Sequence, residues 1–471
     1  MKLNLLDNNF KNLLLYGGSD GSDINPIFIL IPIFVIIVFI SIIIYYFIFS
    51  QPKNTSSSGQ SSLAGKSSLA GQSSLAGQSN ILNSVINYNL IDGNINNNIT
   101  YNDGDNIGSN SALISTSPEW NNNGGIFTAS SDGFYLINAS FFINAKASGS
   151  RISLLVNNKL RYVIIEEDAL VITGATLRTY SRVEQLSRGD TLRFKGVNGF
   201  IVFFGNDNQS HSNISITKLN INNYYNLIEN NVGNITYNNG GHIGSDSALV
   251  STSPEWNKNT GIFTATNDGI YLINASFYIN HKLGGRVALV VNNKVRYVIV
   301  EGKGIASSTL RTYSRVEKLS RGDTLYFDAT DGLTVFFNND NISHSNFTIT
   351  KLNINVNNYY NLIENSVNNI TYNNEDIIGS NSALISTSPE WNSNRGIFTA
   401  SSNGVYLINA SFFINGKSPL TRISLLVNNK LRHCVIEDNP NTIAGETLRT
   451  YSRVEQLNIG CLLYTSDAAD E

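Results

Sequence analysis

The chain has 471 residues and a formal net charge of −3, and only 14% of its residues are charged. This length allows two to four domains, and the even spread of acids and bases argues against a nucleic-acid-binding surface. Asn and Ser take the place of charged residues, and they favour turns and short strands over long helices. With only two cysteines, a fold held together by many disulfides is excluded.

Residues 1–26 are a polar segment, and residues 27–49 follow as an apolar run without a charged side chain. A bilayer core needs about 20 apolar residues in a helix, and this run is longer than the apolar core of a signal peptide. We therefore predict a single transmembrane helix at 27–49 rather than a buried core element. The flanking lysines are nearly balanced, so the charges alone leave its orientation open.

Residues 50–84 form a Ser-, Gly- and Ala-rich stalk, in which residues 61–78 repeat the unit SSLAG(K/Q) three times. Gly recurs at every sixth residue, whereas collagen needs Gly at every third. We favour a flexible linker. The alternative is a trimeric stalk with Leu63, Leu69 and Leu75 as an assembly stripe, but this spacing matches neither a helix nor a heptad.

An internal repeat occupies the chain beyond the stalk. The phrase "SALISTSPEW" ends at Trp120, and close copies end at Trp256 and Trp391, at spacings of 136 and 135 residues. Each copy is long enough to bury a core of its own. We therefore predict a first, second and third repeat at residues 85–220, 221–355 and 356–460.

The second repeat shows the two-residue period of β-strands. In "GIYLINASFYIN", alternate side chains from Tyr271 to Ile279 are aromatic or aliphatic and are expected to face inward. The preceding turn predicts a positive φ at Gly269, and Asn292-Asn293 predicts a hairpin. Roughly eight strands and no helix in each repeat predict an all-β fold of tandem two-sheet jelly-roll sandwiches.

A Phe followed by Gly-x-Tyr and a second Phe, then the "VNNKVR" hairpin and the "LSRGDTL" turn, resembles the signature of the complement C1q domain. The motif positions are Phe127, Gly133, Tyr135, Phe141, Phe263, Gly269, Tyr271, Phe277, Phe398, Gly404, Tyr406 and Phe412. Two features depart from the family pattern. Ile137, Ile273 and Ile408 stand where an aromatic residue is usual, and no collagen-like segment precedes the repeats.

The resemblance implies a ten-strand jelly roll that forms trimers through an apolar seam, as the related tumour necrosis factor ligands do. The order of anchor, stalk and jelly rolls is similar to those type II membrane proteins, which places the repeats outside the cell or on a virion surface. A homotrimer, an intrachain pseudo-trimer and separate beads on a string all remain open. Some family members bind calcium, but no ligands can be assigned here, and no other cofactor is expected.

The Asn-Ala-Ser sequons at Asn138, Asn274 and Asn409 are candidate glycosylation sites. Asn274 shares a strand face with Ser276, so a glycan there needs that face to be in solvent. If the face packs against a neighbour instead, the sequon is inert.

Other motifs carry little chemistry. "SRGD" occurs at residues 187–190 and 320–323, and we interpret its Gly-Asp as turn formers rather than as an integrin motif. The five histidines are His211, His242, His281, His344 and His433. They are expected not to recur at equivalent repeat positions and lack ligand spacing, which argues against a metal or catalytic role. No enzymatic activity is expected.

The third repeat follows the first as far as Gly460, after which "CLLYTSDAADE" replaces the expected strand. Residues 461–471 resemble translated sequencing-adapter DNA, so we expect authentic sequence to end near Gly460. The third repeat would then be truncated, with its final strands missing and sheet edges unpaired.

The favoured hypothesis is a membrane-anchored, non-enzymatic surface protein whose C1q-like repeats trimerise and bind a protein or glycan partner, for adhesion or recognition. The alternative is a structural spike or fibre component of a cell or virion surface without a specific ligand.

Overall fold

The computed structural model describes most of the chain between residues 86 and 467. The described residues are 86–92, 98–167, 175–206, 209–210, 212–229, 233–281, 285–301, 309–330, 332–339, 342–353, 359–365, 369–373, 375–414, 421–438 and 447–467. They form strands and turns without a helix, so none of them lies in a helix that could span a bilayer. The predicted transmembrane helix and stalk lie outside the described residues.

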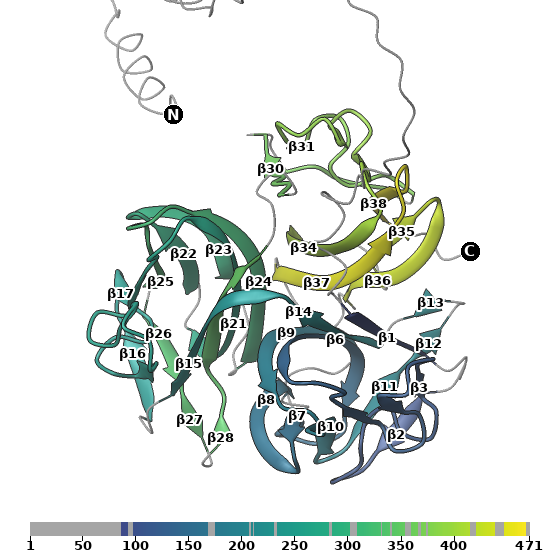
Figure 1. Ribbon diagram of the computed structural model, residues 1–471, viewed down its shortest axis with the longest axis horizontal. Coiled ribbons are helices and arrows are strands. Elements are labelled where there is room, and N and C mark those ends of the chain that lie inside the picture. The colour runs from purple at the N-terminus through teal and green to yellow at the C-terminus, as the bar shows by residue number, and fades with distance from the viewer. Residues whose placement is uncertain are drawn as a thin grey trace, which may run out of the picture. The chain divides into compact units, whose positions relative to one another are not determined.

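Each repeat is a succession of strands, and Figure 1 labels most of them. The first repeat contains β1 (Ile86–Asp92), β2 (Ile99–Tyr101), β3 (Leu113–Ile114), β4 (Trp120–Asn121), β5 (Ile126–Thr128), β6 (Gly133–Ala145), β7 (Ser150–Val156), β8 (Lys159–Glu167), β9 (Thr176–Leu186), β10 (Thr191–Val197), β11 (Phe200–Phe203), β12 (Gly205–Asn206), β13 (Gln209–Ser210) and β14 (Asn213–Leu219). The second contains β15 (Ile221–Glu229), β16 (Asn234–Tyr237), β17 (Gly241–His242), β18 (Leu249–Val250), β19 (Trp256–Asn257), β20 (Ile262–Thr264), β21 (Gly269–His281), β22 (Arg286–Val291), β23 (Lys294–Glu301), β24 (Thr309–Leu319), β25 (Thr324–Thr330), β26 (Leu333–Phe336), β27 (Asn338–Asn339), β28 (Ile342–Ser343) and β29 (Asn346–Leu352). The remaining strands are β30 (Ile363–Glu364), β31 (Leu384–Ile385), β32 (Trp391–Asn392), β33 (Ile397–Thr399), β34 (Gly404–Ile414), β35 (Thr421–Val427), β36 (Lys430–Asp438), β37 (Thr447–Leu457) and β38 (Leu462–Asp467).

The first two repeats each build two antiparallel sheets. In the first repeat one sheet runs β1-β14-β6-β9, with β11 also on β6, and the other runs β4-β5-β10-β7-β8. In the second repeat the first sheet runs β15-β29-β21, and β24 and β26 also pair with β21. The second sheet runs β19-β20-β25-β22-β23. Each buried core draws side chains from both sheets. The predicted all-β jelly-roll fold is therefore confirmed.

The motif strand supplies the centre of each core, because its alternate side chains face the opposite sheet. Tyr135 and Phe141 on β6, like Tyr271 and Phe277 on β21, have 0% exposure. Phe127 meets Tyr135 edge to face at a centroid distance of 5.9 Å, and the equivalent pair in the second repeat is 6.1 Å apart. Such contacts stabilise the core beyond their area burial.

The tryptophan of the repeated "SPEW" phrase makes the same side-chain hydrogen bond in all three repeats. Trp120 Nε1 donates to the Leu113 carbonyl at 2.9 Å, and Trp256 donates to Leu249 at the same distance. Trp391 makes the equivalent bond in the third repeat. The indole N–H groups of the buried Trp120 and Trp256 thus have a partner, as burial requires.

Glycine at position 269 is crowded by a lysine side chain and does not have the positive φ that was predicted. The prediction of a positive φ at Gly269 is wrong, because Gly269 is not among the residues with left-handed backbone. A Cβ there would instead lie 2.5 Å from Cε of Lys351, and at Gly133 it would lie 2.6 Å from Cε of Lys218. The Asn292-Asn293 hairpin is confirmed, with φ values of 51° and 58°.

The third repeat differs from the others at one sheet. Among the described residues, β34 pairs with β37 but has no strand in the place that β14 and β29 occupy beside β6 and β21. Its core-facing side chains, such as Phe412, are only partly buried. β38 pairs with β33 and β35, as β10 pairs with β5 and β7, but Thr465 stands where Phe194 stands in β10.

Candidate assembly interface and axial site

The three repeats meet through one equivalent strand from each, namely β9, β24 and β37. All three strands begin with the same sequence, Thr-Leu-Arg-Thr-Tyr-Ser-Arg. Alternate residues of a strand point to opposite faces, so one face of each strand enters its own sandwich and the other is left for its neighbours. We call the meeting of these three faces the central seam.

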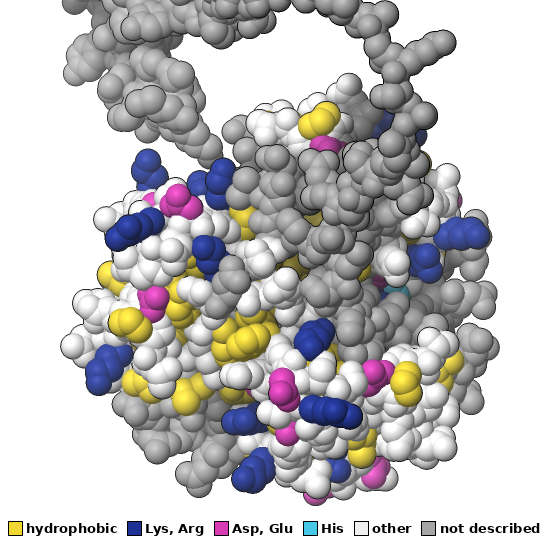
Figure 2. All heavy atoms as spheres, in the orientation of Figure 1, with side chains coloured by type: hydrophobic (Ala, Val, Ile, Leu, Met, Phe, Trp, Pro, Cys, Tyr) yellow, Lys and Arg dark blue, Asp and Glu magenta, His cyan; other side chains and the backbone are white. Residues whose placement is uncertain are grey.

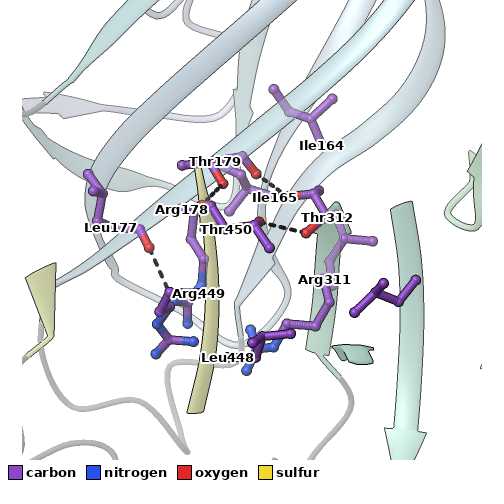
Figure 3. A pocket seen from close by; sticks show the side chains of 12 residues that line it. Ile164, Ile165, Leu177, Arg178, Thr179, Arg311, Thr312, Leu448, Arg449 and Thr450 are labelled. Atoms are coloured by element: carbon purple, nitrogen blue, oxygen red, sulfur yellow. Dashed lines mark hydrogen bonds between the residues drawn. The ribbon is translucent and has the colours of Figure 1, made fainter. Parts of the chain in front are cut away.

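A cycle of hydrogen bonds crosses the central seam (Figure 3). Thr179 Oγ1 donates to the Thr450 carbonyl at 2.8 Å, Thr450 Oγ1 to the Thr312 carbonyl at 2.8 Å, and Thr312 Oγ1 to the Thr179 carbonyl at 2.5 Å. Each repeat therefore donates once and accepts once. The arrangement is a closed, pseudo-threefold ring built within one chain.

A buried polar layer lies next to the threonine cycle. Ser181 Oγ donates to Oδ1 of Asn138 at 2.7 Å, and Asn274 Nδ2 donates to Ser181 and to Ser314 at 2.8 and 2.9 Å. Ser314 Oγ in turn donates to Oδ1 of Asn409 at 3.1 Å. Asn138 and Asn274 are each 2% exposed.

This burial decides how the sequons can behave in the folded chain. A glycan on Asn138 or Asn274 would have to replace amide hydrogen bonds and enter the seam. The structure therefore leaves no room for a glycan at either amide while the repeats are in contact. Asn409, the third candidate, accepts its seam hydrogen bond from a half-buried position.

An apolar layer follows the polar one. Leu136, Val183, Leu272 and Val454 form one buried cluster with residues from all three repeats. Tyr224 from the second repeat packs against it. Tyr224 and Tyr359 each donate a hydroxyl hydrogen bond to a carbonyl of the preceding repeat. Burial of this apolar surface is the main non-specific source of stability for the seam.

An arginine–glutamate pair marks each boundary between repeats. Arg182 Nε donates to Glu184 at 2.6 Å, and its Nη1 donates to Oδ1 of Asn346 in the second repeat. Arg315 pairs with Glu317 at 3.3 Å and donates to Asn361 of the third repeat at 2.7 Å. Arg453 pairs with Glu455 at 2.6 Å and donates to Asn213 of the first repeat. The three boundaries thus follow the same direction around the ring.

In the first two repeats a tyrosine ring stacks on the boundary arginine, and the third repeat has a different residue at the tyrosine position. Tyr162 and Tyr297 lie 3.9 and 3.6 Å from the guanidinium carbons of Arg182 and Arg315. The equivalent residue is His433, whose Nε2 lies 3.1 Å from Glu455. Burial, with Arg453 adding to it, lowers the pKa of His433 to about 4.

Burial favours the neutral forms of Arg182 and Glu455, but the neighbouring side chains stabilise their charged forms. Burial disfavours the charge on Arg182, yet Tyr162 and Glu184 outweigh it and raise the pKa. Burial raises the pKa of Glu455, but hydrogen bonding to His433 and the charge of Arg453 outweigh it and lower the pKa to about 2. Arg182 and Glu455 therefore remain ionised at neutral pH.

A small cavity of about 40 Å³ lies beside the threonine cycle. Its lining consists of the Leu-Arg-Thr triplets 177–179, 310–312 and 448–450, together with Ile164, Ile165 and Ile299. In Figure 3 the arginine side chains extend to the same side of the threonine cycle. On the face shown in Figure 2, by contrast, basic and acidic side chains are interspersed.

The statement that no histidine recurs is wrong for one pair. His211 and His344 each precede an equivalent strand by two residues, in the phrase "SHSN". His344 has 0% exposure and its Nε2 lies 3.0 Å from Glu166 of the first repeat. This distance indicates an interface role for His344. Among the described residues, no group of three His, Cys, Asp or Glu side chains could hold a metal ion.

The aromatic motif residues of the first two repeats lie in the cores and not in the seam. In the SRGD turn, Asp190 accepts from the Ser187 amide at 2.8 Å, which confirms the turn interpretation. The seam arginines and threonines were missed. The available signal was the nine-residue phrase "TLRTYSRVE", which is identical in all three repeats.

The C1q domain family model matches residues 232–348. This part of the second repeat is similar to a C1q domain. Among solved structures, Eiger TNF from S. frugiperda is 13% identical and covers 32% of this chain and 100% of its own, with a TM-score of 0.24. The globular domain of zebrafish complement 1qA protein is 13% identical, covering 27% and 94% with a TM-score of 0.20. Murine APRIL is 12% identical, covering 27% and 98% with a TM-score of 0.19. Among curated proteins, none matches the chain.

Proposed function

We propose that the chain is a membrane-anchored, non-enzymatic recognition protein whose three C1q-like repeats form a pseudo-trimer within a single chain. The observation that supports this most directly is the cycle of threonine hydrogen bonds, in which each repeat contacts the other two. The anchor at residues 27–49 holds the pseudo-trimer at a membrane, with the repeats on the outer side.

The central seam explains why a single chain is enough to build a trimer-like assembly of C1q-like repeats. A homotrimer of single C1q-like domains would use one such strand from each of three chains. Here β9, β24 and β37 already contact one another. Two of the equivalent serines, Ser181 and Ser314, are hydrogen-bonded to each other at 3.3 Å. A second chain would have to displace a covalently tethered neighbour, whose effective concentration is high.

Recognition is the function that fits this arrangement best. The residues that recur in all repeats are apolar core positions, turn formers and seam contacts, which supports a scaffold rather than a reaction centre. The outward surface then presents three similar but non-identical faces to a protein or glycan partner.

The full chain, purified in detergent micelles, tests both parts of the proposal. Light scattering should give the mass of one chain per micelle, and immobilised chain should bind host cells or a glycan array saturably. A Ser314→Arg variant, which places a charge in the buried seam, serves as the control that opens the ring. Three chains per micelle would contradict the pseudo-trimer, and binding that is never saturable would contradict recognition.

A further inference from the structure

The axial cavity concentrates positive charge. Each repeat contributes one arginine to its lining, Arg178, Arg311 and Arg449, and no acidic side chain is among the described residues that line it. Arg178 and Arg449 are each 7% exposed. Three cations that share one small cavity repel one another, and the low-dielectric walls strengthen this effect.

The geometry around the arginines is suited to a single ion. The closed threonine cycle forms one side of the cavity, and the arginine side chains extend away from it together (Figure 3). Arg178 Nη1 already donates to the Leu177 carbonyl at 3.3 Å. Because a guanidinium carries five N–H groups, each arginine can keep its own neighbours and still donate to an anion.

We propose that this cavity binds a tetrahedral oxyanion, as free sulfate or phosphate or as the terminal sulfate or phosphate group of a glycan. Three oxygens face the three arginines, and the fourth is left for solvent or for an ester link. Arginine forks match such oxyanions well. A cavity of about 40 Å³ is roughly three times the 10–15 Å³ that one water needs, so it has room for a ligand of several atoms.

Thermal unfolding of the full chain in detergent tests the site. Sodium sulfate or phosphate should raise the melting temperature saturably relative to sodium chloride at equal ionic strength, because a ligand of the folded state stabilises it. The double variant Arg178→Gln/Arg311→Gln should lose this response. The matched control is Arg188→Gln/Arg321→Gln, which removes the same charge from exposed turns and should retain it.

A second readout separates binding from a merely structural role. Without an oxyanion, the cavity double variant should still unfold in one cooperative transition, so that a lost sulfate response reports the site and not a lost fold. Arg311→Lys keeps the charge but loses the fork, so the half-saturating sulfate concentration should rise several-fold. An equal response to sulfate and chloride overturns the proposal, and so does a sulfate response that persists in the cavity double variant.

The source of the oxyanion is resolved by competition. A sulfated glycan should be displaced by free sulfate, whereas its desulfated form should not bind the cavity. Binding of free sulfate alone assigns the site to the inorganic ion. The site rests on the proposed ring, so ring closure is checked in the same sample by a disulfide between Asn138→Cys and Ser452→Cys. A closed ring without an oxyanion response overturns the oxyanion site alone. An open ring overturns both the oxyanion site and the proposed pseudo-trimer.

Discussion

Arg453 in the third repeat donates a hydrogen bond from Nη1 to Oδ1 of Asn213 in the first repeat, across 240 residues of chain. Arg182 makes the same bond to Asn346 of the second repeat. The bond from Arg453 therefore closes a circuit that the chain order alone would leave open. Both members of the closing pair are buried, with exposures of 1% and 2%.

Removing the closing partner should destabilise the ring. Asn213→Ala leaves the buried Arg453 without this acceptor, and the expected loss is about 1.5–3 kcal/mol, as for a hydrogen bond to a charged group. Urea unfolding followed by the fluorescence of the tryptophans measures it. Asn259→Ala, in an exposed turn, is the control. Equal midpoints for the two variants would show that the contact contributes nothing.

Acid should weaken the third repeat in particular. The pKa of His433 is about 4 in the folded chain, whereas its ordinary value is 6.5. Between these pH values the unfolded chain binds a proton on His433 and the folded chain does not. Stability is therefore lost as the pH falls from about 6.5 to about 4, by roughly 3 kcal/mol at most. Glu455, whose pKa is lowered to about 2, adds a further loss below its ordinary value of 4.5.

The variant His433→Tyr restores the residue found at the equivalent positions Tyr162 and Tyr297. Its melting temperature should fall less than that of the wild type between pH 7 and pH 5. Superimposable pH profiles for the two proteins would rule out His433 as the acid-sensitive group.

The open edge of β34 should make its core residue less important than its counterpart. Phe277 has 0% exposure, so Phe277→Ala should cost about 3–5 kcal/mol. Phe412 is only partly buried, so Phe412→Ala should cost roughly half of that or less. Hydrogen exchange should also be faster in β34 than in β21. Equal costs and equal exchange rates would mean that β34 is covered as fully as β21.

Glycans should be found on sequons that are exposed and not on the buried sequons of the motif strands. Asn98, Asn234 and Asn369 are exposed Asn-Ile-Thr sequons at equivalent positions, whereas Asn274 is buried. If the repeats enter a secretory lumen, mass spectrometry should find glycans on the exposed set and none on Asn274. A glycan on Asn274 in folded protein would be incompatible with the seam, and unmodified exposed sites would argue against the outward orientation.

The fold could be predicted because the alternating apolar positions, such as Tyr271 and Phe277, report burial within one repeat. The seam could not be predicted in this way, since Thr312 and Ser314 alternate as a polar face that is typical of solvent exposure. Only their contact with equivalent residues of the other repeats makes them structural. Gly269 was misassigned for a similar reason, because the side chain that crowds it belongs to Lys351, which lies far along the chain.

The disulfide trap at the closing boundary tests the central claim most directly. Ser452 Oγ lies 3.0 Å from Oδ1 of Asn138, so Asn138→Cys/Ser452→Cys brings two thiols close together across the boundary. The background carries Cys461→Ser, and Cys434 is buried. After oxidation of the full chain, a non-reducing gel should show one compact band with the mass of a single chain at every dilution. A ladder of dimers and trimers linked between chains would contradict the intrachain ring.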